Sequence, residues 1–130
     1  MLFYDLFRLD PEFIKIKAGK VLFREGDHGD DMYVLISGKA EVSIGGVMIA
    51  ECTQGDFVGE MAVVDGSPRY GTVTARTDCK FVVINKARFH FLIDETPGFA
   101  LEVIRIMAKR LKECDLRVVN ATAASQNVSG

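Results

Sequence analysis

Residues 57–75 read FVGEMAVVDGSPRYGTVTA and hold one glutamate, Glu60, and one arginine, Arg69, among small and apolar residues. Glycines stand on both sides of segment 60–64, which can therefore form a single helical turn. The closing run, YGTVTA, is rich in β-branched residues and predicts a short strand. The stretch thus predicts a β-rich fold that carries one carboxylate and one guanidinium in a loop.

The β pattern continues on both sides of this loop, from about residue 18 to residue 84, with glycine-marked turns between short apolar runs. We expect strands at 21–23, 32–36, 40–44, 47–51, 70–75 and 80–84. The clearest hairpin is Ile44-Gly45-Gly46-Val47, because two glycines can supply the positive φ angles of a two-residue turn. Strands this short with frequent turns are typical of a sandwich or barrel.

Helical patterns flank the β unit. Residues 1–14 predict a short amphipathic helix or turn. Asn85 can cap one short helix, and Thr96-Pro97 opens a longer one whose apolar residues repeat at helical spacing to about Val118. The small polar residues 119–130 are expected to be disordered.

We therefore expect an α+β protein, with a β jelly roll or barrel of about eight short antiparallel strands, a short N-terminal helix and two C-terminal helices. The expected division is an N-terminal helical segment at 1–14, the main domain at 15–118 and a tail at 119–130. A chain of 130 residues is long enough for one core and too short for two domains.

The composition argues against several classes of protein. A net charge of -2 predicts no general affinity for nucleic acid. The longest apolar runs are far shorter than a membrane span needs, and the first residues lack the basic region of a signal peptide. The three cysteines have neither a paired nor a metal-ligand spacing. We expect a cytoplasmic protein with reduced thiols, no membrane span and no direct nucleic-acid binding.

Catalysis and metal binding are not expected either. A metal-dependent enzyme on a small β barrel needs a cluster of histidine and carboxylate ligands. The chain has only His28 and His90, one in an expected turn and the other in an expected helix. No serine or cysteine has a credible local base partner for nucleophilic catalysis.

The loop chemistry of residues 57–75 fits a ligand that is both an anion and an alcohol, such as a sugar phosphate. The start of the helical turn presents unpaired backbone N–H groups, and Arg69 adds a planar fork of donors that matches a phosphate. Glu60 is an acceptor for a hydroxyl. The alternative is an internal Glu60–Arg69 ion pair that pins the loop, and the spacing alone favours neither.

Several short motifs follow one another in order along the chain. They are Gly19, Arg24-Glu25-Gly26-Asp27, Gly29-Asp30, Tyr33-Val34-Leu35-Ile36, Gly38, Gly59-Glu60-Met61-Ala62, Ser67-Pro68-Arg69, Gly71-Thr72-Val73, Phe89, Pro97 and Ala108-Lys109-Arg110-Leu111. Together they resemble cyclic nucleotide-binding domains and their phosphate-binding cassette, a family that includes regulatory subunits of the cyclic-AMP-dependent kinase, catabolite-activator-type factors and cyclic-nucleotide-gated channels. The resemblance covers roughly residues 15–115.

The resemblance implies a role for each matched residue of the cassette. Glu60 would accept a hydrogen bond from the ribose 2′-hydroxyl beside the Gly59 backbone, and Arg69 would pair with the cyclic phosphate. Backbone N–H groups of Ala62 and Tyr70 would complete the phosphate cradle. The remaining expected ligand contacts are Met61, Gly71 and Thr72. Asp30 resembles the acid that orients the arginine, or is simply a turn-capping aspartate.

Two further residues concern the base of the nucleotide. The residue after the arginine is usually small in the family, but here it is Tyr70, whose ring could stack on the base, turn outward or fill the pocket. In the family the C-terminal helix closes over the base. Arg110 would then be the stacking cation, unless it is a solvated helix residue.

The resemblance implies a non-catalytic sensor that binds cyclic AMP (cAMP), or cyclic GMP (cGMP), without a metal and signals through movement of its C-terminal helices. The alternative is a ligand-free domain of the same fold that serves as a protein-interaction element. The partner would be an effector protein or a second copy in a homodimer. We expect no transcription factor activity from this chain alone, because the long helix is followed only by about a dozen polar residues.

Overall fold

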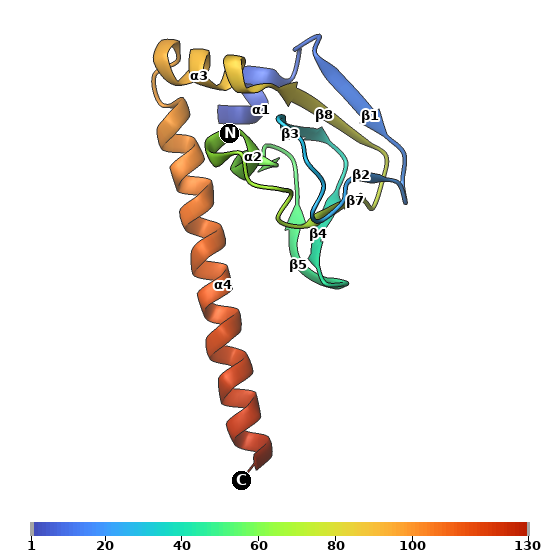
Figure 1. Ribbon diagram of the computed structural model, residues 1–130, viewed down its shortest axis with the longest axis vertical. Helices are drawn as coiled ribbons and strands as arrows, with labels where there is room; N and C mark the ends of the chain where they lie inside the picture. The colour runs from blue at the N-terminus through green and yellow to red at the C-terminus, as the bar shows by residue number, and fades with distance from the viewer. Residues whose placement is uncertain (1, 130) are drawn as a thin grey trace. The chain divides into compact units, whose positions relative to one another are not determined.

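The computed structural model describes residues 2–129, which divide into two compact units, residues 2–96 and residues 97–129. The first unit contains two four-stranded antiparallel sheets (Figure 1). In spatial order, the first sheet holds β1 (Phe13–Ile16), β8 (Cys79–Ile84), β3 (Met32–Ser37) and β6 (Phe57–Val58). The second holds β2 (Val21–Phe23), β7 (Thr72–Ala75), β4 (Ala40–Ile44) and β5 (Val47–Cys52).

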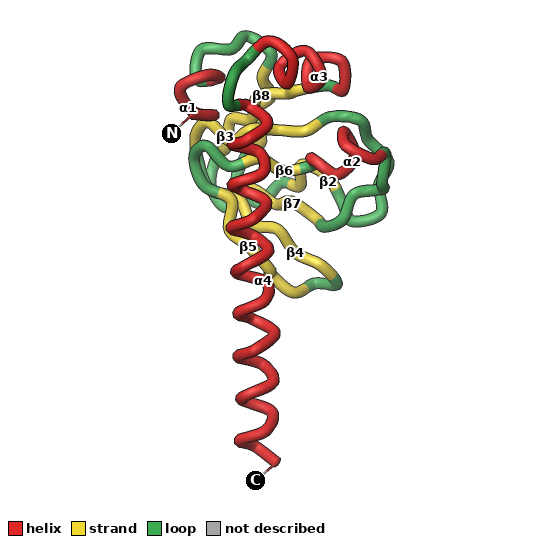
Figure 2. The backbone as a smooth tube through the Cα atoms, turned by 90° about the vertical axis from the view of Figure 1, so that its left-hand side faces the viewer, coloured by secondary structure: helices red, strands yellow, loops and turns green. Residues whose placement is uncertain are grey.

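Among residues 2–129, three helices belong to the first unit and one to the second. Helices are drawn in red in Figure 2. They are α1 (Leu2–Phe7), α2 (Glu60–Asp65), α3 (Lys86–Glu95) and, in the second unit, α4 (Phe99–Ser129). In the first unit, α1 and α2 both pack against β3, and α2 also packs against α3. The expected α+β jelly roll with N-terminal and C-terminal helices is confirmed.

The core lies between the two sheets, because alternate residues of the strands point inward. In β7, for example, Val73 and Ala75 are buried while Thr72 and Thr74 are half-buried. The core cluster comprises Leu35, Ala40, Cys52, Val58, Val73, Ala75, Cys79 and Phe81. These apolar contacts hold together strands that are too short to be stable alone.

The local sequence signals of the β unit and of α3 are confirmed. Ile44 pairs with Val47 across the predicted hairpin, where Gly45 and Gly46 have φ angles of 57° and 81°. Asn85 caps α3, since its side-chain oxygen accepts a hydrogen bond of 2.8 Å from the Arg88 N–H.

The structure also contains two strands that the sequence did not predict. β1 is an edge strand in register with β8, from Phe13 opposite Val82 to Ile16 opposite Cys79. β6 is only two residues long and pairs with β3. Both owe their strand conformation to a distant partner rather than to a long β-branched run of their own.

The long helix differs from the prediction at both ends. Gly98 has a φ angle of 85°, which a right-handed helix cannot accommodate, so α4 begins at Phe99 rather than at Thr96-Pro97. Thr96 instead ends α3, and its N–H donates to Leu92 O. At the other end, α4 runs to Ser129 through residues expected to be disordered. Extension of an existing helix adds one hydrogen bond per residue without a new nucleation cost.

Within residues 2–129, no helix combines the length and the apolar character needed to cross a bilayer.

Candidate anion-binding site

Helix α2 and the glycines at its ends form the frame of the site. Gly59 precedes α2 with a φ angle of 82°, and Gly66 ends it with a φ angle of 73°. A Cβ atom at position 59 would lie 2.6 Å from Arg69 Nη1 and 2.9 Å from Asp31 O. Glycine is therefore required at 59 both by the backbone conformation and by the close approach of Arg69. The single helical turn predicted at 60–64 is confirmed.

The backbone of Arg69 is tied to the turn that follows β2. The Arg69 N–H donates to Asp27 O at 2.8 Å, and Arg69 O accepts from the Gly26 N–H at 2.8 Å. This pair of hydrogen bonds brings the loop that contains Arg69 alongside residues 24–27, which are far from Arg69 in sequence. It fixes the point from which the arginine side chain extends.

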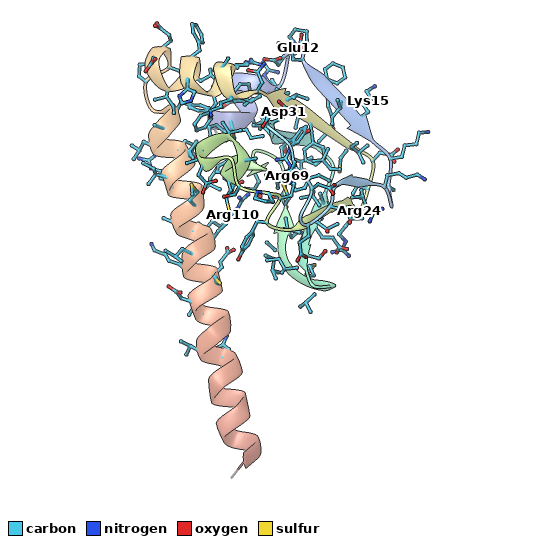
Figure 3. The ribbon with its side chains drawn as sticks, in the orientation of Figure 1. Glu12, Lys15, Arg24, Asp31, Arg69 and Arg110 are labelled. Atoms are coloured by element: carbon cyan, nitrogen blue, oxygen red, sulfur yellow. The ribbon has the colours of Figure 1, made fainter. Side chains whose placement is uncertain are left out.

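The guanidinium of Arg69 lies inside the first unit, and the residue is only 6% exposed. Its Nη1 atom donates to Asp31 O at 2.8 Å and to Gly59 O at 3.4 Å. Figure 3 labels both Arg69 and Asp31 within this unit, where Asp31 is half-buried. The carbon Cζ lies over the Phe23 ring, 4.3 Å from its centroid, and 5.7 Å from the centroid of Tyr33.

The charge of Arg69 is therefore not neutralised by a carboxylate. Among the ion pairs of the described residues, none involves Arg69. The alternative Glu60–Arg69 ion pair is not formed, although Glu60 is also buried, at 8% exposure. The acceptor next to Arg69 is the backbone carbonyl of Asp31, one residue beyond Asp30. The orienting role of the Asp30 carboxylate stays a prediction.

The aromatic ring of Tyr33 remains uncharged beside this cation. Burial, followed by the nearby charge of Asp31, raises the pKa of the Tyr33 phenol above its ordinary value, while Arg69 acts in the opposite direction. Neither Phe23 nor Tyr33 was predicted as a site residue. The sequence offered one indication for Phe23, which directly precedes the turn whose backbone is hydrogen-bonded to the backbone of Arg69.

The other predicted site residues lie around α2 and the start of β7. Ala62 is buried and Met61 is exposed on α2, while Tyr70 is 60% exposed and does not fill a buried cradle. Thr72 Oγ1 accepts from the Glu25 N–H at 2.9 Å. Gly71 passes close to β4, where a Cβ atom would lie 2.9 Å from Ser43 O. Arg110 belongs to α4 in the second unit, and its contact with a ligand stays a prediction.

Among the described residues, no group of three histidine, cysteine or carboxylate side chains could hold a metal ion. His28 and His90 are both exposed.

A separate hollow of about 590 Å³ contains none of the predicted site residues. It is lined by Tyr4, Ile36, Ser37, Gly38, Lys39, Thr53, Gln54 and Lys80.

Comparison with known proteins matches residues 13–96 to the family of cyclic nucleotide-binding domains. Among curated proteins, lysophospholipase nte1 of Neurospora crassa is 31% identical over 106 residues, which are 78% of this chain and 7% of that protein. The Aspergillus fumigatus lysophospholipase nte1 is 27% identical over 124 residues, which are 92% of this chain and 8% of that protein. The chain thus spans less than a tenth of the length of these relatives.

Two solved structures share the fold. PKAR CBD2 with bound Sp-2Cl-cAMPS has a TM-score of 0.65 and 27% identity, and the match covers 79% of this chain and 70% of that one. The catabolite activator protein of Thermus thermophilus has a TM-score of 0.72 and 26% identity, and the match covers 92% of this chain and 63% of that one.

Proposed function

The chain belongs to the family of cyclic nucleotide-binding domains, and on that premise we propose that it is a non-catalytic sensor of cAMP, with cGMP as a weaker ligand. The observation that carries the proposal is the buried guanidinium of Arg69, which has no carboxylate partner among the described residues. A buried cation of this kind is favourable when an anion completes it. A structural neighbour at 27% identity is described as cAMP-bound PfPKA-R.

In the proposed complex, Arg69 pairs with the cyclic phosphate and the backbone N–H groups of Ala62 and Tyr70 complete the cradle. Glu60 accepts a hydrogen bond from the ribose 2′-hydroxyl beside Gly59. Met61, Gly71 and Thr72 line the ligand, and Asp30 helps to orient Arg69. No metal is needed, because the guanidinium and the N–H groups supply the positive field.

Thermal-shift and calorimetric titrations with cAMP and cGMP test this proposal. A ligand that binds only the folded state raises the melting temperature by mass action. We expect cAMP to raise it more than cGMP, without turnover of either nucleotide. If the folded protein shows no shift with millimolar nucleotide, the proposal fails in favour of a ligand-free interaction domain.

We further propose that binding is signalled through the C-terminal helices. Helix α2 packs against α3 within the first unit, so a shift of the cassette is passed directly to α3. From α3 the chain continues through Pro97 and Gly98 into α4, and Arg110 would stack on the base. The ligand can drive this movement only if it binds the closed arrangement more tightly. Spin labels at Ser43 and Lys112 should report a changed distance distribution with saturating nucleotide; identical distributions would refute this mechanism.

The proposed partner is an effector protein or a second copy of this chain, in the cytoplasm. Helix α4 exposes large apolar residues at intervals of three or four, including Leu101, Ile104 and Leu111. An exposed apolar stripe of this kind suits a partner helix. Sedimentation of the wild type and of Ile104→Lys tests the second copy, which is excluded if both sediment as monomers.

A further inference from the structure

We infer that Phe23, supported by Tyr33, is a positioning residue for Arg69. Its ring holds the guanidinium by a cation–π contact, so that the Nε–Nη2 edge of the arginine stays available to an anion. The inference rests on the proposed function, since the anion in question is the cyclic phosphate.

The hydrogen bonds of Arg69 show which part of the guanidinium is already occupied. Within the described part of the chain, Nη1 is the guanidinium atom that donates to the protein, to the carbonyls of Asp31 and Gly59. Among the described residues, Nε and Nη2 donate to no protein acceptor. Every fully buried polar side-chain atom of these residues has a hydrogen-bond partner, so an atom without one is not fully buried. These two donors are therefore still open to solvent. Two donors on one edge are what bidentate pairing with a phosphate requires.

An aromatic partner suits this task better than a carboxylate does. A carboxylate would neutralise the arginine by accepting hydrogen bonds from its N–H groups, and those donors would then be lost to the ligand. The face of a ring attracts the cation without accepting in-plane N–H hydrogen bonds. With Cζ 4.3 Å from the Phe23 centroid, the guanidinium is stabilised while its remaining donors stay free.

The fold holds this aromatic platform firmly. The pairing of β2 with β7 shifts register between Val21 and Phe23, and such irregularities redirect side chains. The rings of Phe23 and Tyr33 lie 6.0 Å apart, and Tyr33 in turn packs edge-on against Phe81 at 6.3 Å. A Cβ atom at position 29 would overlap Arg69 Nη2, so Gly29 leaves room for the Nε–Nη2 edge of the guanidinium.

The test replaces Phe23 with phenylalanines that carry one, two or three ring fluorines. Fluorine withdraws electron density from the ring face and hardly changes its size, so the series weakens the cation–π contact while packing is retained. We expect the Kd values for cAMP and cGMP to rise in parallel with each fluorine, by about 2-fold to 30-fold in total. The same series at Phe13, whose ring has a cation–π contact with Lys80 at 4.1 Å and none with Arg69, is the matched control.

A stepwise rise for the Phe23 series with unchanged Kd values for the Phe13 series supports the inference. Constant Kd values for the Phe23 series, or equal changes in both series, overturn it. If the unmodified protein binds neither nucleotide, the proposed function fails, and NMR of the unliganded protein then decides the inference. An Arg69 Nε–H signal that the ring shifts upfield, and that Phe23→Leu returns to its ordinary position, supports the platform; an unshifted signal in the wild type overturns it.

Discussion

Two arginines of the first unit, Arg69 and Arg88, contact aromatic rings in different electrostatic settings. Arg88 bonds through Nη2 to the Asp10 carboxylate, and its Cζ lies 5.4 Å from the centroid of Phe7. The side chains of Arg88 and Asp10 are 30% and 10% exposed. Arg69 is more deeply buried, yet among the described residues its guanidinium donates to backbone carbonyls and lies over ring faces, without an ion pair.

The difference distinguishes an ion pair that links two parts of the fold from a site that can bind a ligand. The Arg88–Asp10 pair joins α3 to the loop before β1, and both charges are satisfied within the fold. Arg69 keeps unused donors and an uncompensated charge, which costs stability unless an anion is bound. A buried arginine without a carboxylate thus points to a ligand, whereas a paired arginine does not.

The largest expected effect separates the two arginines by ligand affinity. Replacing Arg69 with Ala should cost about 2–5 kcal/mol of cAMP binding, or roughly thirty-fold to a few thousand-fold in Kd, because the phosphate loses its cationic partner. Arg88→Ala is the matched control and should leave Kd nearly unchanged. Isothermal titration measures both, with circular dichroism to show that each variant is folded. Equal affinities for the wild type and Arg69→Ala would contradict the distinction between a ligand-binding Arg69 and a structural Arg88.

The second prediction concerns the contribution of the Asp10 charge to the stability of the fold. A hydrogen bond from Arg88 lowers the pKa of the Asp10 carboxyl, so the folded state favours the ionised form. This stabilisation is present above the pKa of the unfolded chain and is lost as the pH falls through the lowered folded value. Asp10→Asn, which keeps an acceptor for the Glu12 N–H, should lower the free energy of unfolding at pH 7 by about 1.5–3 kcal/mol.

Urea denaturation at several pH values checks this prediction. The difference between the wild type and Asp10→Asn should shrink as the pH falls below about 4, where the unfolded carboxyl takes up its proton. A difference that stays constant down to acid pH would show that the charge of Asp10 is not what stabilises the fold.

A smaller effect is expected at Tyr70, next to Arg69 in the chain. The residue is 60% exposed, so its ring is available to stack on the base of a bound nucleotide. Tyr70→Ala should then lose roughly 1–3 kcal/mol of affinity, the range for base–aromatic stacking. Titration with cAMP decides between stacking and obstruction, since tighter binding by the variant would mean that the ring stands in the way.

The smallest effect is expected at Glu60. Glu60→Gln keeps an acceptor for the ribose hydroxyl but removes its charge, so cAMP affinity should fall by about 0.5–1.5 kcal/mol, or roughly two-fold to ten-fold. The analogue 2′-deoxy-cAMP, which lacks that hydroxyl, is the control ligand. Wild type and Glu60→Gln should bind it with similar affinity, and a persistent difference would place Glu60 outside the ribose contact.

The sequence by itself determined the features that depend on neighbouring residues. The Gly45-Gly46 hairpin, the helical turn of α2 between two glycines and the Asn85 cap all follow from local backbone preferences, and the structure contains each of them. The ordered motifs also sufficed to identify the family. Glu60 and Arg69 were predicted as site residues because an isolated carboxylate and guanidinium stand out in an apolar segment.

Only the tertiary structure decided what surrounds Arg69 and which short segments become strands. Asp31, whose carbonyl accepts from Arg69, is 38 residues away in sequence, and no local pattern shows that this carbonyl is the acceptor instead of the Glu60 carboxylate. Likewise β1 and β6 are strands because β8 and β3 supply their hydrogen-bond partners. Contacts between distant segments form only when the two sheets pack together, so the pairing of a buried charge is settled by topology rather than by spacing along the chain.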